Sequence, residues 1–109
     1  MGNAIKSRIL LVEDEPALRT GTEQFLRQRG FTVMTATSGE EALKKFTQAD
    51  VIILDIMLPG MSGIETLHQI RQTSDVPMLM LTALHDEPTQ VTSFDELADD
   101  YMSKPFSPL

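Results

Sequence analysis

The feature that most constrains the fold is an unbroken apolar run at residues 51–54, which ends in Asp55 and is followed by a Pro59-Gly60 turn. A strand without polar alternation is buried on both faces, as the centre of a parallel sheet requires. An aspartate at the end of such a strand is costly unless a cation meets it. In open α/β sheets, ligands bind just outside the carboxyl ends of the strands. Asp55 is therefore the first candidate for a functional residue.

Strands and helices are expected to alternate along the rest of the chain. Further strands are predicted at residues 8–12, 32–36, 76–81 and 101–103. Helices are predicted from Pro16 to before Gly30, from Ser38, after Gly63, and at 87–97, where poor helix formers make the last one weak. Asp14 or Glu15 is expected to cap the first helix. This alternation predicts an α/β fold with a doubly wound five-stranded parallel sheet.

Length and composition narrow the class of protein. The 109 residues suffice for one compact domain, and a net charge of -7 argues against direct binding of nucleic acid. The sequence has no cysteine, which excludes disulfides and thiolate metal sites and favours a cytoplasmic protein. No apolar run approaches the roughly 18–20 residues of a membrane span, so no membrane association is expected.

Polar residues stand at the carboxyl ends of four predicted strands. They are Glu13 and Asp14, Asp55, Thr82, and Lys104. Parallel strands bring these positions to one edge of the sheet, and three carboxylates placed together there attract a hard divalent cation. Oxygen ligands alone favour Mg²⁺.

The same residues suit phosphoryl transfer, which needs a nucleophile and neutralisation of the charge on the phosphoryl oxygens. Asp55 is the predicted nucleophile and would form an acyl phosphate. Lys104 offers a mobile positive charge to one phosphoryl oxygen, and Thr82 offers a hydroxyl donor to another.

Five motifs carry a family resemblance. They are the segments at 9–15 (ILLVEDE), 54–63 (LDIMLPGMSG), 81–83 (LTA), 98–101 (ADDY) and 104–106 (KPF). The chain resembles the receiver (CheY-like) domain of a bacterial two-component response regulator, most closely the OmpR-type winged-helix transcription regulators. Leu97 departs from the pattern, because many relatives have glycine there.

The resemblance implies a flavodoxin-like sheet with strand order 2-1-3-4-5, and phosphorylation of Asp55 by a sensor histidine kinase. It implies that Mg²⁺ is held by Glu13, Asp14, Asp55 and the backbone carbonyl of Met57. Thr82 and Tyr101 would form the conformational switch pair. No enzyme activity is expected beyond self-catalysed phosphoryl transfer to Asp55 and auto-dephosphorylation.

Family members continue beyond the point where this sequence stops. Residues 1–109 are therefore expected to be a C-terminally incomplete receiver domain that lacks the fifth helix. Self-association or homodimer formation is expected, and DNA binding only through an effector domain absent from this sequence.

Three alternatives differ in function. A phosphatase of the haloacid dehalogenase type would need an aspartate at Met57, and a flavodoxin would need a phosphate loop in place of Glu13-Asp14-Glu15. The third is a non-phosphorylated pseudo-receiver that acts as an interaction module. The presence of Asp55, Thr82 and Lys104 disfavours it.

Overall fold

The computed structural model describes residues 7–82 and 100–103, with the backbone alone at Thr82 and 100–103. The elements are β1 (Arg8–Val12), α1 (Pro16–Gln28), β2 (Thr32–Ala36), α2 (Gly39–Lys45), the 3₁₀ turn η1 (Phe46–Gln48), β3 (Val51–Asp55), α3 (Gly63–Arg71), β4 (Met78–Thr82) and β5 (Asp100–Ser103). The weak helix predicted at 87–97 lies outside the described residues.

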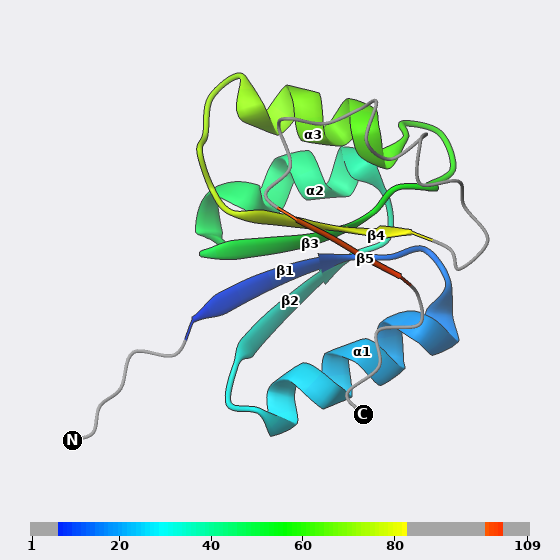
Figure 1. Cartoon of the computed structure of the whole chain (residues 1–109), viewed down its shortest axis with the longest axis vertical. Helices are drawn as coiled ribbons and strands as arrows, with labels where there is room; N and C mark the ends of the chain where they lie inside the picture. The colour runs from blue at the N-terminus through cyan, green and yellow to red at the C-terminus, as the bar shows by residue number, and fades with distance from the viewer. Residues whose placement is uncertain (1–6, 83–99, 104–109) are drawn as a thin grey trace.

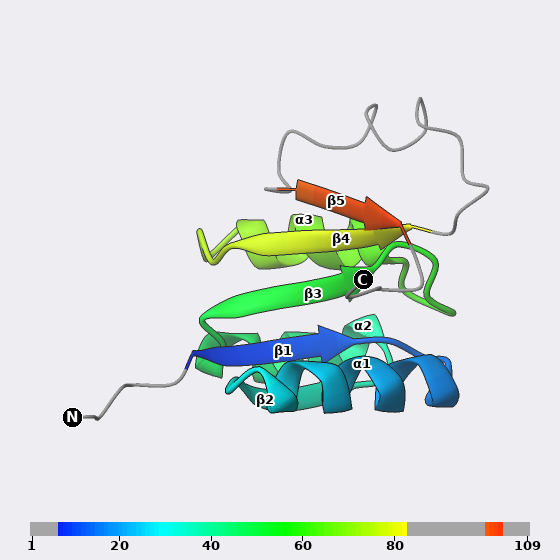
Figure 2. The same ribbon diagram turned by 60° about the horizontal axis from the view of Figure 1, so that its bottom comes forward.

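The five strands form one parallel sheet in the order β2-β1-β3-β4-β5 (Figures 1 and 2). The predicted flavodoxin-like topology is thereby confirmed. The first strand in the sequence lies inside the sheet, because the chain adds β2 on one side of β1 and the later strands on the other.

Helices cover both faces of this sheet. Figure 1 shows α2 and α3 on one face and α1 on the opposite face. Successive residues of β1 and β3 alternate between two separate hydrophobic clusters, because side chains of a strand point to opposite faces. Leu10 and Ile52 pack on the α2–α3 side, whereas Leu11 and Ile53 pack on the α1 side with Leu26. Burial on both faces explains why these strands show no polar alternation.

Most helices and strands begin and end close to the residues predicted from the sequence. Ser38 caps α2, and Gly30 follows α1 with a φ of 97°, both as expected. The fourth strand begins at Met78 instead of residue 76. The carbonyl of Val76 accepts a hydrogen bond from Arg71 Nη1 at 2.6 Å, whereas the carbonyl of Pro77 accepts from the Ile52 N–H of β3.

The outer edge of β2 is covered by two cationic side chains. Thr32 and Ala36 bond to the β1 side, so the carbonyls of Val33 and Thr35 point away from β1. Arg27 Nη2 of α1 donates to Val33 O at 2.8 Å.

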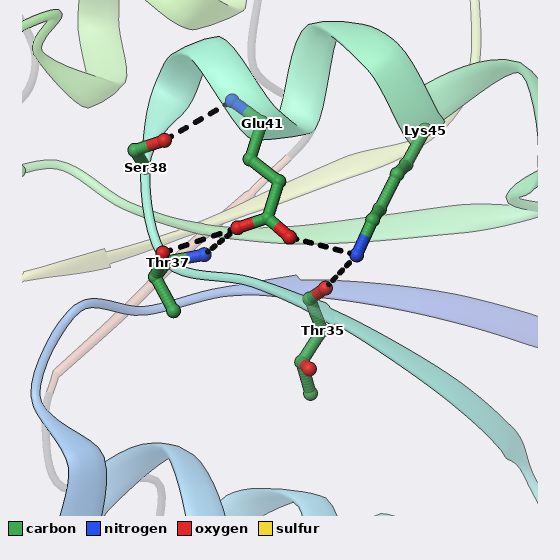
Figure 3. A network of polar contacts seen from close by, with 5 residues as sticks. All are labelled: Thr35, Thr37, Ser38, Glu41 and Lys45. Atoms are coloured by element: carbon green, nitrogen blue, oxygen red, sulfur yellow. Dashed lines mark hydrogen bonds and ion pairs between the residues drawn. The ribbon is translucent and has the colours of Figure 1, made fainter.

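From the opposite face, Lys45 Nζ of α2 donates to Thr35 O at 2.7 Å (Figure 3). Each cation is held by the carboxylate four residues earlier on its helix: Glu23 for Arg27 at 3.0 Å, and Glu41 for Lys45 at 2.9 Å. We name these two Glu–cation pairs the β2 clasps.

The described helices are short, and α1 is the longest at 13 residues. In this part of the chain, none combines the length and apolarity that crossing a bilayer takes.

Candidate functional site

The carboxyl ends of β1, β3 and β4 lie level with one another. Val12 is opposite Leu54, and Asp55 is opposite Leu81. Glu13, which follows β1 directly, therefore lies at the level of Asp55. The register itself brings together the acidic residues that the sequence places far apart.

The loop between β1 and α1 is held by its own carboxylates. The Glu13 N–H donates to Ala36 O at 3.0 Å, and a side-chain oxygen of Glu13 accepts from the Glu15 N–H at 3.1 Å. Glu15 caps α1 by accepting from the Leu18 N–H at 2.8 Å, so the cap is Glu15 and not Asp14. Asp14 is thereby left to face the site.

The loop after β3 fixes the rotation of the Asp55 carboxylate. The Met57 N–H donates to Asp55 Oδ1 at 3.1 Å, a bond typical of turns that begin with aspartate. The Ile56 N–H donates to Leu81 O at 3.0 Å and ties the loop to β4. Met57 is 67% exposed, so this methionine contributes to the loop through its backbone.

Three carboxylates converge at this edge of the sheet. One side-chain oxygen each of Glu13, Asp14 and Asp55 lies within 4.8 Å of the other two. Glu13 and Asp55 are each only 1% exposed, and Asp14 is more exposed than either. Carboxylates at this distance, two of them buried, repel one another, and a hard cation between them would relieve the repulsion. The all-oxygen donor set fits Mg²⁺.

The other predicted site residues lie at or beyond the limit of the described residues. Thr82 ends β4, one residue beyond the position opposite Asp55, and Tyr101 lies in β5. Lys104 is outside the described residues. The functions assigned to these three residues stay predictions.

Two further residues contact the backbone of the acidic cluster and were not singled out from the sequence. Arg19 Nη1 donates to Glu13 O at 3.0 Å and approaches Asp14 O at 3.4 Å. Gly63 packs against the peptide of Asp55 so closely that a Cβ atom there would collide with the Asp55 carbonyl oxygen. In the sequence, Arg19 could have been noticed because it lies one helical turn after the acidic residues. Gly63 could have been noticed because it ends the 54–63 motif.

Comparison with known proteins identifies the family. The model of the response regulator receiver domain matches residues 9–109, and the chain belongs to this family. Curated relatives of similar sequence are described as transcriptional regulators, in agreement with the resemblance seen in the motifs.

The uncharacterized transcriptional regulatory protein YclJ of Bacillus subtilis is 47% identical over 104 residues, which cover 94% of this chain and 46% of YclJ. The alkaline phosphatase synthesis transcriptional regulatory protein PhoP of the same organism is 46% identical, with 95% of this chain and 45% of PhoP covered. The chain thus spans less than half the length of these relatives.

A solved structure supports the same assignment. Response regulator protein TrrA from Thermotoga maritima, in complex with Mg²⁺-BeF, is 40% identical with a TM-score of 0.81. The match covers 93% of this chain and 89% of TrrA.

Proposed function

We propose that residues 1–109 form a receiver domain that acts as a phosphorylation-dependent switch, in which Asp55 accepts a phosphoryl group from a sensor histidine kinase. The observation that carries this proposal is the convergence of Asp55 with Glu13 and Asp14 at the level ends of the strands. A carboxylate buried at this place and held in one rotation by the Met57 N–H is a preorganised nucleophile.

The reaction conserves atoms and charge. An Asp55 carboxylate oxygen forms the new O–P bond while the P–N bond of the phosphohistidine breaks, and the electron pair returns to the imidazole nitrogen. The product is an acyl phosphate on Asp55. The receiver domain itself is proposed to catalyse this transfer from the kinase and the later hydrolysis of the acyl phosphate.

Glu13, Asp14, Asp55 and the backbone carbonyl of Met57 are assigned to hold Mg²⁺. When bound, this cation offsets the negative charge that the phosphoryl oxygens bring into the acidic cluster. Glu13 and Asp14 supply carboxylate oxygens from the loop after β1. We assign the Thr82 hydroxyl and the Lys104 ammonium to two phosphoryl oxygens, and Thr82 with Tyr101 to the switch that follows.

The output is proposed to be transcription control in the cytoplasm. The relatives are transcriptional regulators, and the chain corresponds to less than half of each. We therefore propose that DNA is bound by an effector domain outside this sequence. Association of receiver domains in pairs would transmit the phosphorylated state to that domain.

The test is labelling with the small phosphodonor acetyl phosphate, followed by intact mass. The wild type should gain one phosphoryl group in the presence of Mg²⁺ and none in excess chelator. Asp55→Asn should gain none, whereas Asp50→Asn should label normally, because exposed Asp50 precedes β3 at the opposite end of this strand.

Normal labelling of Asp55→Asn would refute the assignment of the phosphoacceptor. A folded wild type that gains no phosphate would favour the interaction module without phosphorylation.

A further inference from the structure

Arg19 lies one turn into α1, and its guanidinium reaches back to the loop that carries two of the three clustered carboxylates. Its Nη1 donates to the carbonyl oxygen of Glu13 at 3.0 Å and approaches that of Asp14 at 3.4 Å. We propose that Arg19 is a positioning residue, which holds the peptide units of Glu13 and Asp14 so that both carboxylates converge on Asp55. The inference rests on the magnesium site proposed above.

The geometry of an extended chain explains why such a residue is needed. Consecutive residues of a strand point to opposite sides. Glu13 and Asp14 are consecutive and follow β1 directly, yet their carboxylates reach the same place. The backbone must therefore turn between them, and a turned backbone in a loop stays in place only if its polar groups are bonded.

The other bonds of the loop involve its N–H groups and side chains, among them the bond from the Glu15 N–H to Glu13 Oε2 at 3.1 Å. The Glu13 N–H is tied to Ala36 O in β2, and the Glu15 side chain is tied to the helix through the Leu18 N–H. Arg19 instead donates to the backbone carbonyl of Glu13 and approaches that of Asp14. Its own N–H donates to Glu15 O at 2.9 Å, so the arginine is fixed to the regular helix from which its side chain extends.

The positive charge of Arg19 and its positioning role predict opposite changes in Mg²⁺ affinity when the arginine is removed. A positive charge near the cluster opposes the approach of a second cation, so loss of the charge alone would strengthen Mg²⁺ binding. Loss of a group that holds the ligands in place would weaken Mg²⁺ binding. The sign of the change in affinity therefore distinguishes positioning from simple electrostatics.

The experiment measures the Kd for Mg²⁺ by titration calorimetry on the whole chain. Arg19→Gln should weaken binding about tenfold, the lower end of the effect of removing groups that orient metal ligands. Arg19→Lys should weaken it less, because it keeps the charge but lacks the planar fork of the guanidinium. The matched control is Arg29→Gln, which alters an arginine at the other end of α1 that contacts the Phe25 ring at 4.7 Å. Its Kd should equal that of the wild type.

A second measurement needs no metal. In Mg²⁺-free protein, hydrogen exchange at the Glu15 amide should be faster in Arg19→Gln than in Arg29→Gln, because this amide depends on the position of the Glu13 carboxylate. Acetyl phosphate labelling of Arg19→Gln should return to the wild-type rate at saturating Mg²⁺.

Unchanged or tighter Mg²⁺ binding by Arg19→Gln, with a wild type that binds Mg²⁺, would overturn this inference and leave the proposed function intact. A wild type without Mg²⁺ affinity would overturn the proposed metal site and this inference with it.

Discussion

Gly63 shows how one residue without a side chain shapes the loop that presents Asp55. Its N–H donates to Ile56 O at 2.9 Å, and an added Cβ would collide with the Asp55 carbonyl oxygen and lie 2.7 Å from the Ile56 Cα. The backbone of β3 and the first turn of α3 can approach this closely because no side chain separates them.

Replacement of Gly63 by alanine should therefore destabilise the protein by about 1–3 kcal/mol, the usual cost of overpacking. Gly21 is the matched control: it lies inside α1 with nothing within 4 Å of an added Cβ. Gly21→Ala should raise stability by about 0.5–1 kcal/mol, because alanine is the better helix former. Urea unfolding measures both changes. A Gly63→Ala variant as stable as the wild type would disprove the close approach.

The protonation of the Glu41 carboxylate makes the stability of the folded protein depend on pH in the acid range. Hydrogen bonding to the Lys45 side chain, followed by the Thr37 N–H, lowers the pKa of Glu41 from 4.5 to about 2 (Figure 3). A pKa that is lower in the folded state means that the stabilisation is complete above 4.5 and is lost as the pH falls toward 2.

Glu41→Gln should reduce stability at pH 7 by up to about 1 kcal/mol, since the pair is partly exposed to solvent and screened by it. The difference between wild type and variant should shrink between pH 4.5 and 2.5. Urea unfolding at a series of pH values would show it, and a difference that stays constant over this range would contradict the assignment.

At the level of elements, β2 is an edge strand whose outward carbonyls are both occupied by the β2 clasps. Unpaired strand edges recruit further strands from other molecules, and charged side chains are a common protection. The clasps come from helices on opposite faces of the sheet, so the edge is covered from both sides.

The double variant Arg27→Gln/Lys45→Gln should form larger assemblies at protein concentrations where the wild type does not self-associate. The control Arg29→Gln/Lys44→Gln makes the same change of charge on the same helices, and in the structure neither residue donates to β2. Sedimentation velocity over a range of concentrations compares them. Equal behaviour of the two double variants would show that the clasps do not protect the edge.

The central strands β1 and β3 could be predicted from the sequence because they are buried on both faces, and α1 and α2 because Gly30 ends the one and Ser38 caps the other. The capping of α1 by Glu15 instead of Asp14, and the start of β4 at Met78, could not. These depend on a hydrogen bond to one of two adjacent acids and on Arg71, whose partners are fixed only in the folded chain. The acidic cluster could be predicted because the strand order brings its residues to one edge of the sheet. The contacts of Arg19 and Gly63 could not, because they depend on the conformation of the loops.

For the whole molecule, the acidic cluster couples stability to divalent cations. A cation that binds only the folded state stabilises it by about 1.4 kcal/mol at ten times its Kd. Asp14→Asn should raise the melting temperature of the metal-free protein, because it relieves repulsion, and should reduce the increase caused by Mg²⁺. Asp50→Asn should keep the full increase. Thermal melts with Mg²⁺ or chelator measure both, and a wild type insensitive to Mg²⁺ would argue against the metal site.

The interior position of β1 also sets the order in which the site is completed. When β1 and β2 have left the ribosome, one side of β1 is still open, and it is filled only when β3 pairs with it. The contact at the start of these two strands joins distant parts of the chain: the Arg8 N–H donates to Asp50 Oδ2 at 2.8 Å across 42 residues. Until β3 pairs with β1, Glu13 and Asp14 have no Asp55 beside them. A nascent or half-folded chain therefore has no assembled acidic cluster, and the phosphorylation proposed at Asp55 would distinguish finished domains from unfinished ones.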